Sequence, residues 1–128
     1  MNKLFPAFAT VIVMAACQTT TDTNAGTPAP GATQLATQSD MAAITGKTLT
    51  HQPGQSIKIL ADGTITGTWD GKPLVGTYVM KDGFFCRTLT EGPRGPSPED
   101  CQLLVLDGNK IDGTRDRGNG NSFEYTVS

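Results

Sequence analysis

Charge of one sign and long apolar runs are both scarce in this sequence. Ten Lys and Arg residues are balanced by twelve Asp and Glu residues, which leaves a formal net charge of −2 at pH 7. Without a basic stripe we expect no nucleic-acid partner. The apolar run Leu4–Met14 is shorter than the about 20 residues that a bilayer core requires, so we expect it to be a processing signal.

Residues that perform catalysis or bind metals are equally few. The single histidine, His51, has no motif partner, and no serine lies in a nucleophile-elbow pattern. The carboxylates of the Asp-Gly pairs are explained by turn chemistry. Two cysteines beyond the leader and one histidine do not supply the four ligands of a usual zinc site. We therefore expect no enzyme, no cofactor and no metal site.

The first 17 residues have the organisation of an export signal. Lys3 precedes the apolar run, and Met14-Ala15-Ala16 precedes Cys17. This segment resembles the lipobox of bacterial lipoproteins, although the family usually has Leu where Met14 stands. The resemblance implies removal of residues 1–16 and acylation of Cys17 with palmitate-type chains. Two alternatives remain open, an ordinary secretory signal cleaved near Ala16 and an uncleaved anchor.

A lipidated Cys17 would make the membrane the first partner of this protein. Several acyl chains on one residue give a durable attachment, whereas a single chain binds only reversibly. Gln18 follows the cysteine, and by resemblance to enterobacterial sorting this favours the outer membrane, with the protein facing the periplasm. A further partner from the envelope or among secreted proteins is compatible with this location.

Residues 17–39 have the composition of a flexible linker. They are rich in Thr, Ala, Gly, Pro and Gln, with little apolar surface to offset the entropy of ordering. The alternative, a partner-binding strip, has only Pro28-Ala29-Pro30 in its favour. We expect residues 40–128 to form one domain, opened by a single helical turn after Ser39 and Asp40.

The domain has the pattern of an all-β chain. Asp-Gly pairs recur between alternating or β-branched segments, and such pairs are the strongest short-range signal for hairpins. We predict a small antiparallel up-and-down meander of six to eight strands that forms a barrel or a sandwich. The three prolines of residues 91–99 predict a long loop before a strand at 100–106. The Asp-Gly pairs are at 62–63, 70–71, 82–83 and 107–108.

A weak repeat of an apolar residue, any residue, Gly and Thr covers residues 65–68, 74–77 and 111–114. A glycine inside a strand lowers stability, so its recurrence indicates sharp coiling or an aromatic ring over the bare backbone. Trp69 and Tyr78 are the expected rings. The alternative is a groove that glycines open for a ligand.

Cys86 and Cys101 are the two thiols left after Cys17. They lie on consecutive predicted strands at corresponding inward positions, and exported proteins live where disulfides persist. We predict a disulfide between them, with buried free thiols or a redox pair as alternatives.

Charge concentrates in the stretch Thr114-Arg115-Asp116-Arg117-Gly118. Arg115 and Arg117, with Arg87, can present guanidinium groups to a carboxylate or a phosphate. Trp69 and Tyr78 are the aromatic candidates for the same binding role. In the alternative interpretation the arginines only pair with nearby carboxylates, which are Asp100, Asp112 and Asp116.

About 60 residues of the domain resemble small alphaproteobacterial envelope proteins of unknown activity. The resemblance rests on Gly67-Thr68-Trp69, Asp82-Gly83, Phe85-Cys86-Arg87 and Asp100-Cys101-Gln102. A weaker likeness is to bacterial metalloprotease-inhibitor barrels. We therefore expect a lipid-anchored, non-enzymatic envelope protein with a structural or binding role. The alternatives are a protease inhibitor-like barrel that binds protein and a barrel that binds a small ligand.

Overall fold

The computed structural model describes residues 31–128 and shows an all-β protein. Nine strands form one antiparallel sheet, accompanied by two short helices. The elements are β1 (Ala32–Gln34), α1 (Gln38–Met41), β2 (Thr48–Gln52), β3 (Gln55–Ile59), β4 (Thr64–Trp69), β5 (Lys72–Lys81), β6 (Phe84–Glu91), β7 (Ser97–Asp107), β8 (Lys110–Thr114), α2 (Arg115–Gly118) and β9 (Ser122–Val127).

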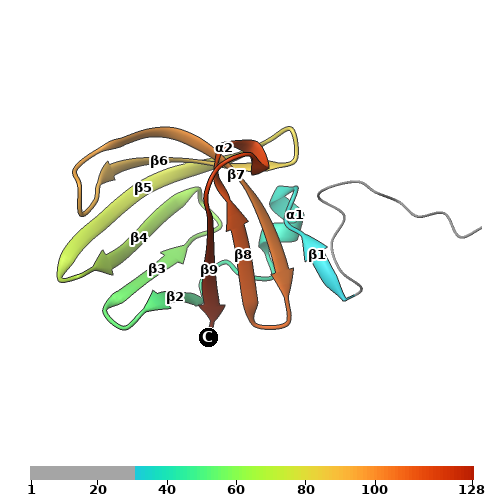
Figure 1. The fold of residues 1–128 in the computed structure, drawn as a ribbon, viewed down its shortest axis with the longest axis horizontal. Coiled ribbons are helices and arrows are strands. Elements are labelled where there is room, and N and C mark those ends of the chain that lie inside the picture. Colours follow the sequence, from blue (N-terminus) through green and yellow to red (C-terminus); the bar gives the residue numbers. More distant parts are fainter. Residues whose placement is uncertain (1–30) are drawn as a thin grey trace, which may run out of the picture.

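Strands β2 to β9 close into an up-and-down barrel (Figure 1). Each pairs with the next strand along the chain, and β9 returns to pair with β2. The predicted antiparallel meander is confirmed, with eight strands in a barrel. The additional strand β1 pairs with the last residues of β7.

Two of the predicted Asp-Gly turns have the geometry that a two-residue hairpin requires. Asp70 and Gly71 have φ of 52° and 81°, and Asp82 and Gly83 have φ of 52° and 82°. Positive φ at both positions is typical of the type I′ turn, whose twist matches that of the strands. These turns place β4 beside β5 and β5 beside β6.

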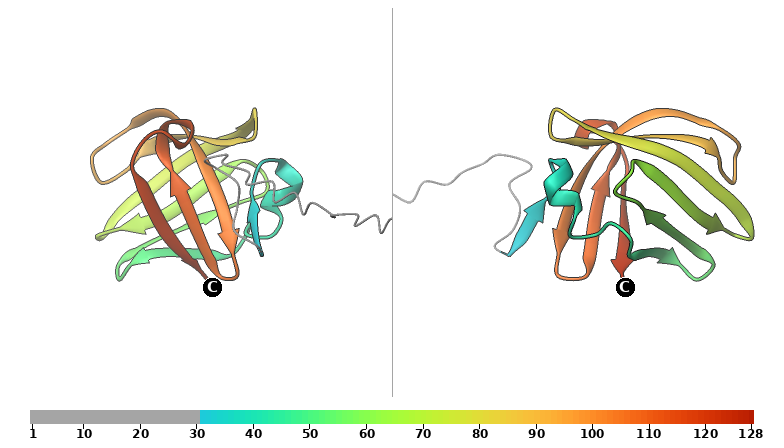
Figure 2. Two further views of the ribbon diagram at one scale, coloured as in Figure 1. Left: turned by 45° about the vertical axis from the view of Figure 1, so that its right-hand side comes forward. Right: turned by 180° about the vertical axis from the view of Figure 1, so that it is seen from behind.

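The two ends of the barrel differ. We call the end with the β2–β3, β4–β5, β6–β7 and β8–β9 connections the mouth, and the opposite end the base. Helix α1 lies at the base, and Figure 2 shows it beside β1 on the reverse side of the molecule. Leu35, Met41 and Ile44 from this N-terminal segment are at most 1% exposed. The segment therefore closes the base with apolar side chains.

The predicted linker boundary at residue 39 is wrong. Residues 32–34 form β1, Leu35 lies in the core, and its backbone N–H donates to the Leu104 carbonyl. Helix α1 is capped by Thr37 instead of Ser39, in a capping box that Asp40 completes. Backbone hydrogen bonds to β7 order this polar stretch, because its few apolar side chains bury too little surface to do so alone. Residues 1–30, with the lipobox and Cys17, lie outside the described residues.

The proline-rich loop is shorter than predicted, because β7 already begins at Ser97 and includes Pro98. The register of β6 and β7 shifts here, from Arg87 opposite Asp100 to Leu89 opposite Ser97. A proline is tolerated at the start of a strand or at such an irregularity, since no ladder donor is needed there.

Neither expected ring, Trp69 or Tyr78, supplies the atoms nearest to a Cβ added at the repeated glycines. A Cβ added at Gly113 would meet the ring of Phe123, and at Gly67 and Gly76 it would meet the backbone of the neighbouring strand. Close approach of strands is thus the main reason for these glycines, and the aromatic cover at Gly113 comes from β9.

The predicted disulfide joins Cys86 and Cys101, which are direct partners across β6 and β7. Its predicted inward direction is wrong. Phe85 and Gln102, the adjacent residues on the two strands, line the barrel interior, so alternation places both cysteines on the outer face. Val79, opposite Cys86 on β5, is accordingly 51% exposed.

Neither helix in the described part of the chain has the length and apolar character needed to cross a membrane.

Candidate functional site: an arginine pocket at the barrel mouth

A pocket of about 430 Å³ opens at the mouth. This volume is within the range of small-molecule sites, roughly 300–1,000 Å³. Its lining combines arginines with aromatic and aliphatic side chains, and no acidic residue of the described chain lines it. The lining residues are Trp69, Leu74, Arg87, Leu89, Pro93, Arg94, Gly95, Ser97, Arg115, Asn121 and Tyr125.

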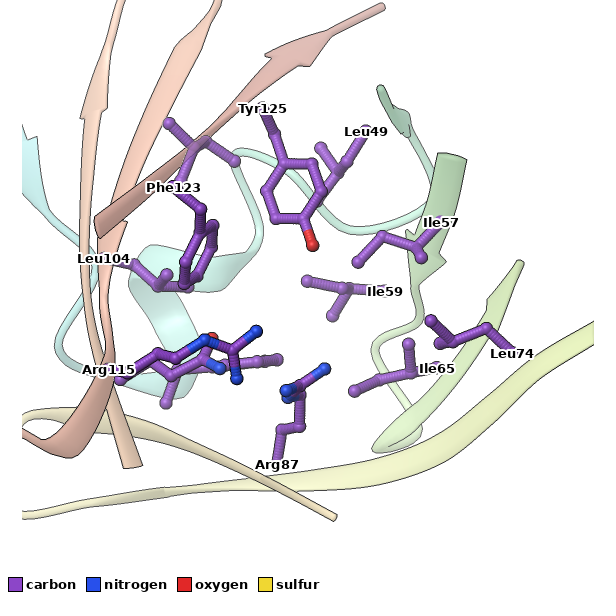
Figure 3. Close-up of a pocket in the computed structure, with 13 residues that line it drawn as sticks. Leu49, Ile57, Ile59, Ile65, Leu74, Arg87, Leu104, Arg115, Phe123 and Tyr125 are labelled. Carbon is purple, nitrogen blue, oxygen red and sulfur yellow. The ribbon is translucent and has the colours of Figure 1, made fainter. Parts of the chain in front are cut away.

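Arg87 is the central cation of this pocket. Strand β6 directs it inward together with Phe85 and Leu89, and Figure 3 shows its guanidinium group pointing into the interior. The Nε atom is buried without a hydrogen-bond partner. Arg87 also takes part in none of the three ion pairs found among residues 31–128. A buried donor without a partner is costly, so Arg87 has unused capacity to bind an anion.

Asp100, the residue opposite Arg87, partly offsets through its charge the lowering of the Arg87 pKa by burial, but it makes no hydrogen bond or ion pair with Arg87. One Asp100 oxygen accepts hydrogen bonds from the Arg115 guanidinium at 3.2 Å and the Gln102 amide at 2.9 Å. The other oxygen accepts from the backbone N–H of Asp116 at 3.1 Å. The carboxylate is therefore engaged by Gln102 and by the β8–β9 connection, and Arg87 has no direct contact with it.

A strained turn positions Arg115. Asp116 and Arg117 both have left-handed backbone conformations, with φ of 52° and 53°. This conformation is unfavourable for residues other than glycine and persists where surrounding structure imposes it. The Arg115 guanidinium lies 5.5 Å from the centre of the Phe123 ring, in a cation–π arrangement. The turn and these contacts hold Arg115 beside Arg87.

The proximity of the two arginines affects the titration of the site. Burial lowers the pKa of the Arg87 guanidinium, and the positive charge of Arg115 lowers it further. An arginine nevertheless stays protonated at neutral pH. Burial raises the pKa of Tyr125, so its hydroxyl keeps its proton at neutral pH. Figure 3 shows this hydroxyl pointing toward the arginines. The two guanidinium groups offer only hydrogen-bond donors and positive charge, and the protonated hydroxyl adds a further donor.

Trp69 forms an aromatic wall of the pocket. The His51 ring stacks on it, with centroids 5.5 Å apart and planes 15° from parallel. His51 Nδ1 lies 2.9 Å from the Glu124 carbonyl oxygen, which fixes the imidazole ring on β9. The Tyr125 ring meets His51 edge-on. Trp69 is thereby held as a rigid surface.

Below the arginines the barrel is filled. The inner cavity has a volume of about 20 Å³, which is room for about one water molecule. Leu74, Arg87, Arg115 and Tyr125 line both this cavity and the mouth pocket. These four residues are therefore the floor of the mouth pocket.

The structure brings together three of the five candidate binding residues. Trp69, Arg87 and Arg115 line the pocket. Tyr78 instead lies at the base, where its hydroxyl donates to the Leu60 carbonyl and accepts from the Gln38 amide. Arg117 lies over the Phe84 ring on the outer face. The alternative that the arginines pair with carboxylates holds for Arg115, which pairs with Asp100.

Sequence reasoning missed Arg94, Asn121 and the pocket-facing hydroxyl of Tyr125. The inward direction of Tyr125 follows from the alternation of β9, in which Phe123, Tyr125 and Val127 pack against the core. Arg94 and Asn121 belong to connections at the mouth, where no periodic pattern exists to indicate direction.

One group of potential metal ligands occurs in the described chain, formed by Cys86, Glu99 and Cys101. The two sulfur atoms are bonded to each other, so neither is the thiolate that metal binding requires. A single exposed carboxylate remains.

Replacing Arg87 by Met is expected to stabilise the protein. The substitution removes a buried unpaired donor and a charge next to Arg115, so we expect the free energy of unfolding to rise by about 1–2 kcal/mol. Urea denaturation measures this change. The matched control Lys58→Met removes a positive charge at an exposed position, and we expect it to change the free energy of unfolding by less than about 0.5 kcal/mol. A less stable Arg87→Met variant would show that Arg87 serves the fold and not a ligand.

Comparison with protein-family models, with curated protein sequences and with solved structures found no match to this chain.

Proposed function

We propose that this chain is a lipid-anchored, non-enzymatic protein of the cell envelope that binds a small anion at the mouth of its barrel. The observation that carries the proposal is Arg87, a guanidinium directed into an open pocket with its Nε buried and unpaired. Arginine side chains bind carboxylates and phosphates through paired, charge-assisted hydrogen bonds. Arg115 and Arg94 add positive charge around the same space.

Trp69 is the only tryptophan of the chain and lines the pocket, so its fluorescence reports on occupancy. The detergent-solubilised full-length protein is titrated with acetate, phosphate and cyclohexanecarboxylate at constant ionic strength, because salt screens such contacts. We expect a saturable emission change with at least one anion. The change should persist in Lys58→Met and disappear in Arg87→Met. Absence of any saturable response in the wild type would exclude the proposed binding.

The envelope location rests on the lipobox resemblance at Cys17 and is tested separately. Detergent phase partitioning compares the wild type with Cys17→Ala. We expect the wild type in the detergent phase and the variant in the aqueous phase, because acyl chains supply the membrane affinity. If both stay in the aqueous phase, the anchor is refuted and the binding proposal is unaffected.

In the protease-inhibitor alternative, the proline-rich loop or the leading segment of the domain would enter a protease. Pro93, Arg94 and Gly95 of that loop line the mouth pocket. This placement favours a small ligand over a protease as the occupant of the site.

A further inference from the structure

The mouth pocket combines apolar with cationic side chains. Trp69 of β4 and Leu89 of β6 form an apolar wall, which Leu74 of β5 continues down to the floor. The cationic and hydroxyl groups come from Arg115 of α2, from Tyr125 of β9 and from Arg87, which lies on β6 with Leu89. A ligand that satisfies both kinds of side chain must carry an anionic group and an apolar body.

The charge is concentrated at the floor. Arg87, Arg115 and Tyr125 separate the pocket from an inner cavity of about 20 Å³. That cavity has room for about one water molecule and is too small for part of a ligand. The anionic group must therefore be the innermost part of the ligand. The apolar body then lies nearer the opening, against Trp69.

The balance of charge favours a monoanion. Asp100 already pairs with Arg115 at 3.2 Å, so Arg87 is the one floor cation without a carboxylate partner. Its planar guanidinium matches the two oxygens of a carboxylate. The stacked His51 ring keeps Trp69 in place, so a flat apolar body can lie on the indole with little loss of side-chain freedom.

We propose that the ligand is a small organic carboxylate with a flat apolar body, its carboxylate on Arg87 at the floor and its body against Trp69. This inference rests on the proposed function and specifies its ligand class. If the apolar body added nothing to the affinity, the proposed anion site at Arg87 would still stand, without this ligand class.

Isothermal titration calorimetry on the detergent-solubilised full-length protein tests the proposal with acetate, benzoate, 2-naphthoate, inorganic phosphate and benzamide. We expect the affinity to rise by about tenfold or more from acetate to 2-naphthoate, because a ring buries apolar surface on the wall. Benzamide should bind at least about tenfold more weakly than benzoate, because it lacks the charge that Arg87 attracts.

Variants separate the two parts of the site. Trp69→Leu should reduce 2-naphthoate affinity about tenfold and leave acetate affinity nearly unchanged, whereas Arg87→Met should abolish binding of both. Equal affinities for acetate and 2-naphthoate, or tighter binding of phosphate than of every carboxylate, would overturn this inference and leave the anion site intact. Benzamide binding as tight as benzoate, or no binding of any probe, would overturn the proposed function as well.

Discussion

Replacing Cys86 and Cys101 together by Ala is expected to lower the free energy of unfolding by about 3 kcal/mol. The disulfide closes a loop with a sequence separation of 15 residues, and a cross-link of this span restricts the unfolded chain by about that amount. Domains of this size have a total stability of roughly 5–15 kcal/mol. Thermal unfolding should therefore shift downward by about 10–20 °C.

The matched control is the wild-type protein reduced by dithiothreitol, which loses the bond but keeps both sulfur atoms. Cys86 is 1% exposed, so the alanine variant also loses packing around that side chain. Reduced wild type and variant should both be destabilised, the variant somewhat more. A reduced protein as stable as the oxidised one would mean that the bond does not limit the unfolded chain.

The disulfide also lies next to the floor of the pocket. The pair Arg87 and Asp100 directly follows the pair Cys86 and Cys101 in the ladder of β6 and β7. Asp100 in turn holds Arg115. Loosening of the two strands would therefore weaken the contact that keeps the Asp100 carboxylate on Arg115. Asp100 could then pair with Arg87, the residue opposite it, and compete with the anion. We therefore expect anion affinity to fall together with stability.

Much of the fold could be predicted because its information is local. Each Asp-Gly pair specifies a turn within a few residues, and alternation along strands such as Ile57–Ile59 and Phe123–Val127 specifies the inner face. Consecutive short connections then leave a meander as the simplest topology. Barrel or sandwich stayed open, because closure depends on pairing of β9 with β2, which are far apart in the sequence.

The direction of Arg87 could not be predicted with the same certainty. Residues 84–89 carry large apolar side chains on both faces, since Phe84 and Phe85 are neighbours. The alternation therefore has no unique phase, and the prediction of inward cysteines rests on one of two possible phases. The structure has the opposite phase, with Phe85, Arg87 and Leu89 inside. An arginine on the inner face is unexpected from burial preferences alone.

The N-terminal segment was missed for a different reason. Its composition around Leu35 is that of a linker, with a single large apolar residue before Met41. It is ordered by backbone pairing of β1 with β7 and by burial of Leu35 at the base. Composition does not reveal such pairing, because backbone hydrogen bonds are available to any sequence without proline.

Replacing Gly67 by Ala is expected to lower the free energy of unfolding by about 3 kcal/mol. Gly67 lies opposite Ile57 on β3. An added Cβ would lie 2.8 Å from the Ile57 Cα atom and closer still to the Ser56 carbonyl oxygen. Both are backbone atoms of a paired strand, so relief requires β3 and β4 to separate. Chemical denaturation of the variant measures the loss.

Two further substitutions make the test of this contact specific. Thr66→Ala, at the adjacent exposed position of β4, should cost less than about 1 kcal/mol. Gly113→Ala should be less damaging than Gly67→Ala, because its obstacle is the Phe123 ring, a side chain that can rotate away. If Gly67→Ala were no more destabilising than Thr66→Ala, β3 and β4 would not approach closely at this point. Close strand approach would then fail as the reason for glycine in the repeat, and the groove-forming alternative for Gly67 would regain support.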